Sequence, residues 1–211
     1  MGNKTEINAK GKEKAEALLK VEDRSLSFIQ YASGLRQTEL KVICNLSIQA
    51  NRGEILAVVG SSGSGKSLLA HAILGILPSN AKLDGKIEYD GQELTQKNKE
   101  DLRGKEIALV PQSVTYLDPL MKISNQVIGA VEEGKEGLMK KLQREIFQKY
   151  DLKPDVERMF PHELSGGMAR RVLVSTAVMS SAKLIIADEP TPGLDEKTLN
   201  ETLSYFKDMA N

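Results

Sequence analysis

The stretch VVGSSGSGKSLLAHAILG, from Val58 to Gly75, decides the fold because it joins two kinds of secondary structure through a flexible loop. The apolar, β-branched run GEILAVVG at 53–60 predicts a parallel strand that is buried on both faces. A helix is expected from Lys66 to about Leu77, where apolar side chains share one face and Pro78 marks the end. Between the two lies a loop of glycines and serines that ends in a lysine.

This loop fits the pattern Gly-x-x-x-x-Gly-Lys-Ser, and its position between a strand and a helix is the one that phosphate binding requires. Glycines let the backbone turn so that successive N–H groups point at phosphate oxygens, and the helix N-terminus adds partial positive charge. Lys66 is then expected to contact the β- and γ-phosphates, and the Ser67 hydroxyl to ligate magnesium. The predicted phosphate-binding residues are Gly60, Ser61, Ser62, Gly63, Ser64, Gly65, Lys66, Ser67 and Leu68.

Composition narrows the classes of partner. The chain has 211 residues, enough for one core, and its 29 basic and 29 acidic side chains cancel, which argues against nucleic acid as a partner. The lone Cys44 cannot form an internal disulfide, which favours a reducing compartment. Because no apolar run could cross a bilayer and the charged start is unlike a secretory signal, a role at a membrane would require docking onto a membrane-embedded partner.

Strands that alternate with helices predict an α/β fold with a mostly parallel sheet. Residues 25–32 and 42–50 alternate apolar and polar positions, which predicts a small antiparallel β layer against that core. Further strands are expected at 85–94 with a turn at Asp90–Gly91, at 106–112 and at 183–190, and helices at 137–152, 166–179 and 196–211.

The predicted organisation has three parts. Residues 1–19 form a polar N-terminal tail, for which a short helix is the alternative. Residues 20–112 and 180–211 form the core with its antiparallel layer, and residues 113–179 form an inserted, mostly helical subdomain.

Two further motifs complement the loop. The apolar run LIIADEP ends in Asp188 and Glu189, which places two carboxylates at the carboxyl edge of a parallel sheet, where such sheets bind ligands. Asp188 could hold magnesium, and Glu189 could orient and deprotonate an attacking water. The run LSGGM opens a helix with Ser165, Gly166 and Gly167, which form a capped N-terminus and a second anion site.

The order of these motifs resembles the nucleotide-binding domain of ATP-binding cassette (ABC) proteins, in which LSGG is the signature, and the resemblance covers nearly all of the chain from about Leu19. It implies a P-loop NTPase (RecA-like) core with a helical signature subdomain, and ATP and Mg²⁺ as ligands. In this family Gln112 would be the Q-loop glutamine, which touches magnesium and the attacking water, and Asp195 would belong to the D-loop. Phe28 looks like the aromatic residue that stacks on adenine, with Tyr31 as its rival.

Three further runs of sequence indicate which group of ABC proteins the chain resembles. The runs DPLMKISNQV, LSGGMARRV and IIADEPTPGLD look like the group of oligopeptide, dipeptide and nickel importers. The resemblance implies ATP hydrolysis that powers solute import, with Glu189, Gln112 and Lys66 as catalytic residues and Ser67, Gln112 and Asp188 at the metal. The implied partners are a second ATPase subunit docked head to tail, permease subunits and an extracellular solute-binding protein, at the cytoplasmic face of the membrane.

Two alternatives stay open. One is a soluble ABC ATPase without a transport role, against which the short spacing between Lys66 and Ser165 and the neutral charge weigh. The other is a nucleotide-binding fragment that hydrolyses ATP slowly or not at all. The sequence ends before the strand that carries the switch histidine of the family, so we expect an incomplete cassette with weak activity.

Overall fold

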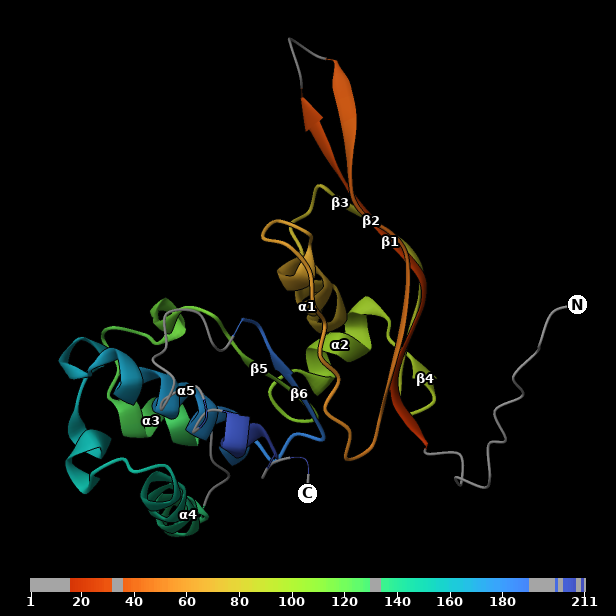
Figure 1. The fold of residues 1–211 in the computed structure, drawn as a ribbon. Coiled ribbons are helices and arrows are strands. Elements are labelled where there is room, and N and C mark those ends of the chain that lie inside the picture. The colour runs from red at the N-terminus through yellow and green to blue at the C-terminus, as the bar shows by residue number, and fades with distance from the viewer. Residues whose placement is uncertain are drawn as a thin grey trace, which may run out of the picture.

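The computed structural model describes residues 16–31, 36–129, 134–189, 200, 203–207 and 210. Figure 1 shows an antiparallel sheet on one side, a helical lobe on the other, and a short parallel pair of strands between them. The strands are β1 (Ala17–Tyr31), β2 (Gln37–Asn51), β3 (Ala81–Tyr89), β4 (Gln92–Glu93), β5 (Ile107–Val110) and β6 (Leu184–Ala187). The helices are α1 (Lys66–Leu74), α2 (Gln96–Leu102), α3 (Ile123–Ile128), α4 (Glu136–Lys149) and α5 (Gly166–Met179), with 3-10 turns η1 (Val114–Tyr116), η2 (Pro154–Arg158) and η3 (Pro161–Glu163).

The antiparallel sheet has the order β2-β1-β3-β4 and confirms the predicted N-terminal β layer. Its β3–β4 hairpin turns at Asp90 and Gly91, whose φ angles of 50° and 74° suit the tight turn expected there. The predicted end of the polar tail at residue 19 is wrong, because β1 already begins at Ala17. Leu18 and Leu19 are buried in the core, which is where apolar side chains of a paired strand belong.

Two apolar clusters hold the two sides together. One lies between the antiparallel sheet and α1 and includes Val21, Leu26, Ile73 and Ile87. The other fills the helical lobe around α3, α4 and α5. The half-buried side chains of β6 divide between them, since Ile186 packs against the first cluster and Ile185 against the second. Alternation along one strand therefore joins the sheet layer to the lobe.

The parallel part of the sheet consists of β5 and β6, which pair in register from Ile107–Leu184 to Val110–Ala187. Both strands were predicted, and β5 ends at Val110, directly before Pro111, which lacks a donor for the ladder. The two strands point the same way, so the residues that follow them, from Pro111 and from Asp188, emerge at one edge.

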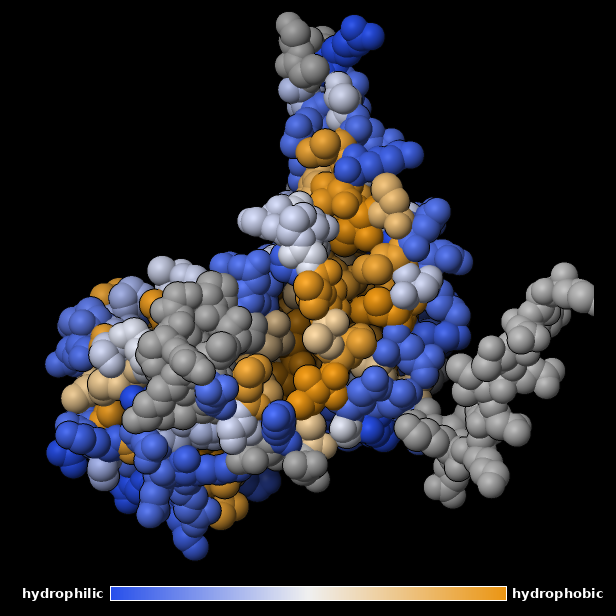
Figure 2. All heavy atoms as spheres, in the orientation of Figure 1, coloured by the Kyte–Doolittle hydropathy of each residue, from blue (hydrophilic) through white to orange (hydrophobic). Residues whose placement is uncertain are grey.

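The predicted parallel strand at 53–60 is wrong. Residues 54–61 belong to no strand, and the apolar side chains of this run are exposed: Val59 is 91% exposed and Ile55 55%. Figure 2 shows hydrophobic side chains at the surface over the trace that leads from β2 to α1. An apolar run becomes a strand only where a neighbouring strand accepts its hydrogen bonds, and no described strand pairs with this one.

Helix α1 begins at Lys66 as predicted but ends at Leu74, three residues earlier than expected. Gly75 adopts the left-handed conformation (φ 70°) that closes a helix, and α2 supplies donors for the last carbonyl groups. The buried Lys99 ammonium donates to Ala72 O at 2.7 Å, and Arg103 Nε donates to Leu74 O at 3.2 Å. Burial lowers the pKa of Lys99 to about 8.

The lobe formed by residues 113–179 is mostly helical, as the sequence predicts. Helix α5 has the predicted bounds, α4 covers most of 137–152, and the rest of 113–164 holds short helices. Of the helix expected at 196–211, the described positions 200, 203–207 and 210 are helical. Within the described ranges, no helix has both the length and the apolar character that crossing a bilayer requires.

Candidate functional site

The loop Gly60–Ser67 wraps the N-terminus of α1, and its glycines have geometric reasons. Gly65 has φ 91°, and a Cβ there would come within 3.0 Å of Ile43 and 3.1 Å of Val42 on β2. A Cβ on Gly60 would meet Ser64 Oγ at 2.6 Å. Gly65 is therefore constrained by its backbone conformation and by its neighbours on β2, whereas a side chain at Gly60 would require the Ser64 hydroxyl to move. The loop is held against β2 by contact rather than by the extended residues that precede it.

Lys66 points back over this loop. Its Nζ donates to the carbonyl oxygens of Gly60 and Ser61, both at 2.9 Å, and lies 3.4 Å from Glu189 Oε1. The predicted phosphate-binding ammonium is thus next to the predicted general base. Its side chain is 19% exposed, so a ligand can still reach it.

The second link between the loop and β6 is a hydrogen bond from Ser67 Oγ to Asp188 Oδ1 at 2.9 Å, across 121 residues of sequence. Asp188 is held at the end of β6 because its backbone N–H donates to Val110 O of β5. A hydroxyl and a carboxylate side by side are oxygen ligands of the kind that Mg²⁺ prefers, so the residues present fit a magnesium ion.

Glu189 takes an unusual backbone conformation, with φ 44° in the left-handed region. Its Oε2 accepts a hydrogen bond from Gln112 Nε2 at 2.7 Å. Five of the predicted residues, from the loop, the end of β5 and the end of β6, are therefore gathered at one place: Lys66, Ser67, Gln112, Asp188 and Glu189.

Other predicted residues are not part of this cluster. Ser165 caps α5, its Oγ accepting from Met168 N at 3.3 Å, and a Cβ on Gly166 or Gly167 would meet nothing within 4 Å. Within the part of the chain that the structure describes, no hydrogen bond or ion pair joins them to Lys66 or Glu189. Figure 1 shows α5 in the helical lobe, beyond β5 and β6 from α1. Asp195 lies outside the described residues.

The two candidate adenine-stacking residues differ in position. Phe28 pairs with Leu40 on β2, two residues from the Val42 that contacts Gly65, and it is partly buried against the sheet cluster. Tyr31 is 66% exposed near the end of the hairpin, where its hydroxyl accepts from Gln37 Nε2. Adenine stacking by Phe28, with Tyr31 as the alternative, stays a prediction. The side chain of Leu68 packs on the same cluster, so only its backbone N–H is available to a phosphate.

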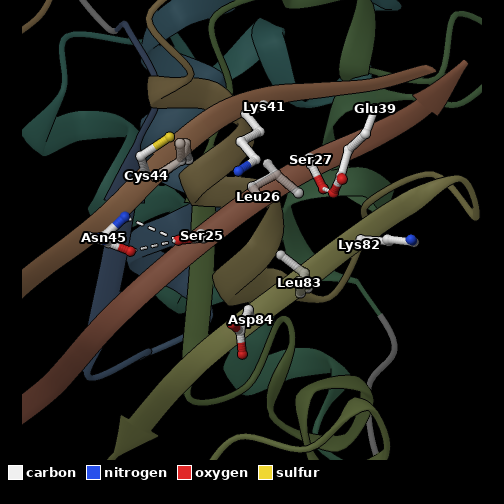
Figure 3. Close-up of a pocket in the computed structure, with 11 residues that line it drawn as sticks. Ser25, Leu26, Ser27, Glu39, Lys41, Cys44, Asn45, Lys82, Leu83 and Asp84 are labelled. Atoms are coloured by element: carbon white, nitrogen blue, oxygen red, sulfur yellow. Dashed lines mark hydrogen bonds between the residues drawn. The ribbon is translucent and has the colours of Figure 1, made fainter.

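A separate hollow of about 520 Å³ crosses β1, β2 and β3 (Figure 3). Two pairs of its polar side chains bond to each other, since Ser25 donates to Asn45 Oδ1 and Ser27 donates to Glu39 Oε1. None of the predicted site residues lines it. The hollow is therefore not part of the candidate site.

Comparison with known proteins supports the family resemblance that the motifs indicate. A family described as "ABC transporter" matches residues 43–192. The oligopeptide transport ATP-binding protein OppD of Bacillus subtilis is 34% identical over 91% of this chain and 55% of its own length. The dipeptide transport ATP-binding protein DppD of Lactococcus lactis is 33% identical over 85% of this chain and 53% of its own length. The chain thus spans about half the length of these curated relatives.

Solved structures show the same fold. The ATP-binding cassette MJ0796, in a dimeric post-hydrolysis state bound to ADP and Pi, superposes with a TM-score of 0.74 at 25% identity, covering 92% of this chain and 83% of that one. CbiO1 from Clostridium perfringens, part of the transporter complex cbiONQ, superposes with a TM-score of 0.71 at 25% identity, covering 92% and 74%.

Proposed function

Because this chain belongs to the ABC transporter family, we propose that it is the ATP-binding and ATP-hydrolysing part of a subunit that powers peptide import. The observation that carries the proposal is the hydrogen bond between Ser67 and Asp188, which joins the phosphate loop to the carboxylates that follow β6. Peptide rather than nickel is the proposed cargo, because the relatives named above are oligopeptide and dipeptide transport proteins.

In the proposed mechanism the backbone N–H groups of the loop and the Lys66 ammonium bind the β- and γ-phosphates of ATP. Ser67 and Asp188 would hold Mg²⁺, with Gln112 as a third candidate ligand, and the ion would supply positive charge that neutralises the phosphates. Glu189 orients the attacking water and takes its proton. Phe28 stacks on adenine.

The N-terminus of α5 completes the site in trans. Its two glycines face open space, and a capped helix N-terminus suits an anion. We expect Ser165, Gly166 and Gly167 of a second cassette to close over the γ-phosphate bound to the first, and Asp195 to lie at the same contact. Permease subunits at the cytoplasmic face of the membrane and an extracellular solute-binding protein are the remaining proposed partners.

A second candidate, a nucleotide-binding chain with little turnover, is favoured by one observation. The residues that lead into the loop, 54–59, are exposed and belong to no strand, so the loop is anchored mainly through Gly65 and β2. A poorly anchored loop binds nucleotide but holds the reacting groups less firmly. The two candidates differ in ATP turnover, not in ATP binding.

Nucleotide binding is tested by Lys66→Ala, with Lys183→Ala as the matched control. Lys183 is an exposed lysine beside the start of β6, at the opposite end of the strand from Asp188. A hydrogen bond to a charged group is worth about 1.5–3 kcal/mol, so Lys66→Ala should weaken binding of a non-hydrolysable ATP analogue about 10- to 100-fold. Lys183→Ala should leave it unchanged. Equal affinity of both variants in calorimetry would refute the proposal.

The role of Glu189 is tested by Glu189→Gln. General-base catalysis contributes about 10²- to 10⁴-fold, so ATP turnover should fall by that order while analogue binding is retained. Phosphate release measures the turnover. Should Glu189→Gln hydrolyse ATP at the parental rate, another group must activate the water.

A further inference from the structure

The loop carbonyls take two of the three N–H donors of the Lys66 ammonium, and the nitrogen also lies beside the Glu189 carboxylate. An ammonium has three N–H donors, and three oxygens surround it: Gly60 O and Ser61 O at 2.9 Å, and Glu189 Oε1 at 3.4 Å. The first two belong to the loop that is to bind phosphate. The third is an anion, and it contacts the same nitrogen that a phosphate oxygen would contact.

Glu189 is engaged on both sides. While Oε1 faces Lys66, Oε2 accepts from Gln112 Nε2 at 2.7 Å. In this arrangement Lys66 and Gln112 hold the carboxylate that would otherwise receive a proton from water. Its left-handed backbone (φ 44°) is a conformation that a residue with a side chain adopts only when its surroundings hold it there.

We infer that Lys66, Glu189 and Gln112 form an autoinhibitory latch in which the Glu189 carboxylate competes with a phosphate for the Lys66 ammonium. The inference rests on the proposed function for the identity of the ligand. A triphosphate carries more negative charge than one carboxylate and is also bound by the loop amides, so it displaces Glu189. The same displacement releases Glu189 toward the water, which couples occupation of the loop to activation of the base.

The neighbouring carboxylate provides a matched control. Asp188 is adjacent in sequence and is also a carboxylate, but it accepts a hydrogen bond from Ser67, and among the described residues Lys66 forms its ion pair with Glu189 instead. A general electrostatic effect of the two acids on Lys66 would make both carboxylates matter alike. The latch instead predicts that the availability of the Lys66 ammonium depends on Glu189 and on the uncharged Gln112.

The test measures the reactivity of Lys66 itself. The full chain, purified without nucleotide and kept in EDTA, is pulse-labelled with acetic anhydride, and acetylation of Lys66 is quantified by mass spectrometry relative to the exposed Lys183. Glu189→Ala should raise the relative labelling of Lys66 severalfold, Gln112→Ala should raise it to a smaller extent, and Asp188→Asn should leave it near the parental value. An unchanged ratio in Glu189→Ala, or an equal rise in Asp188→Asn, would overturn the latch.

A second measurement separates the latch from the proposed function. In EDTA, the association rate of a fluorescent non-hydrolysable ATP analogue should rise severalfold in Gln112→Ala, which removes one of the two contacts that hold Glu189 without altering the charge of the site. An unchanged rate in Gln112→Ala counts against the latch. If the parent chain binds no analogue at all, the proposed function fails, while the labelling ratio still decides whether the latch exists.

Discussion

Two apolar runs lead into the site, and only one of them is a strand. Residues 54–59 and β6 are both short, aliphatic and rich in β-branched side chains, and each ends at a group of the candidate site. β6 pairs with β5 and its side chains are half-buried, whereas 54–59 pairs with no described strand and exposes Val59 almost fully. Composition makes a run apolar, but a hydrogen-bonding neighbour makes it a strand.

A matched pair of proline substitutions, one in each run, tests this comparison most directly. The N–H groups of Leu184 and Asp188 donate to Glu106 and Val110, so by alternation the N–H of Ile186 also faces β5. Ile186→Pro removes a ladder hydrogen bond and should lower the free energy of unfolding by about 3 kcal/mol or more.

Val58→Pro is the control for that change. No ladder hydrogen bond exists at Val58, so the free energy of unfolding should change by less than about 1 kcal/mol. Urea unfolding followed by circular dichroism measures both variants. A loss at Val58 as large as at Ile186 would mean that 54–59 is paired in solution.

A second pair of variants asks what anchors the loop at the end of the unpaired run. Gly65→Ala combines a left-handed backbone with close contacts to Val42 and Ile43, and should cost about 2–3 kcal/mol of stability and lower ATP-analogue affinity. Gly63→Ala has the backbone strain alone, since nothing lies within 4 Å, and should cost about 1–2 kcal/mol. If thermal unfolding shows equal losses of stability for the two variants, contact with β2 does not anchor the loop.

The smallest expected effect is that of replacing valine by alanine, which we compare at a buried and at an exposed position. Val110→Ala in β5, where the side chain is 4% exposed, removes two buried methyl groups and should cost about 2 kcal/mol. Val59→Ala, at 91% exposure, should change stability by less than about 0.5 kcal/mol. A difference of less than 1 kcal/mol between the two midpoints, converted through the urea m-value, would contradict the burial of the two runs.

Most elements of the fold follow from local patterns. The hairpin at Asp90–Gly91, the end of β5 at Pro111 and the helix that starts after Ser165 depend on residues with special backbone or capping properties, which act within a few positions. The early end of α1 has one local cause, Gly75, whose left-handed conformation closes a helix. The donors that Lys99 and Arg103 supply to its last carbonyl groups come from 27 and 29 residues away and have no local signal.

The candidate site divides in the same way. Residue types and spacing identified the phosphate loop, Asp188 and Glu189, since the loop chemistry and the strand-end positions are local, whereas Gln112 was identified only through the resemblance to the ABC family. That Glu189 would lie against Lys66 and Gln112 in a left-handed conformation has no local signal, because Gln112 is 77 residues from Glu189 in the chain and Lys66 is farther still.

The sequence by itself thus determined which residues could bind phosphate and which runs were apolar, because those properties belong to side chains and short segments. Only the tertiary structure decided which apolar run found a partner strand and which oxygens surround Lys66. Pairing and ion contacts depend on what the rest of the chain brings alongside, and no window of sequence contains that information.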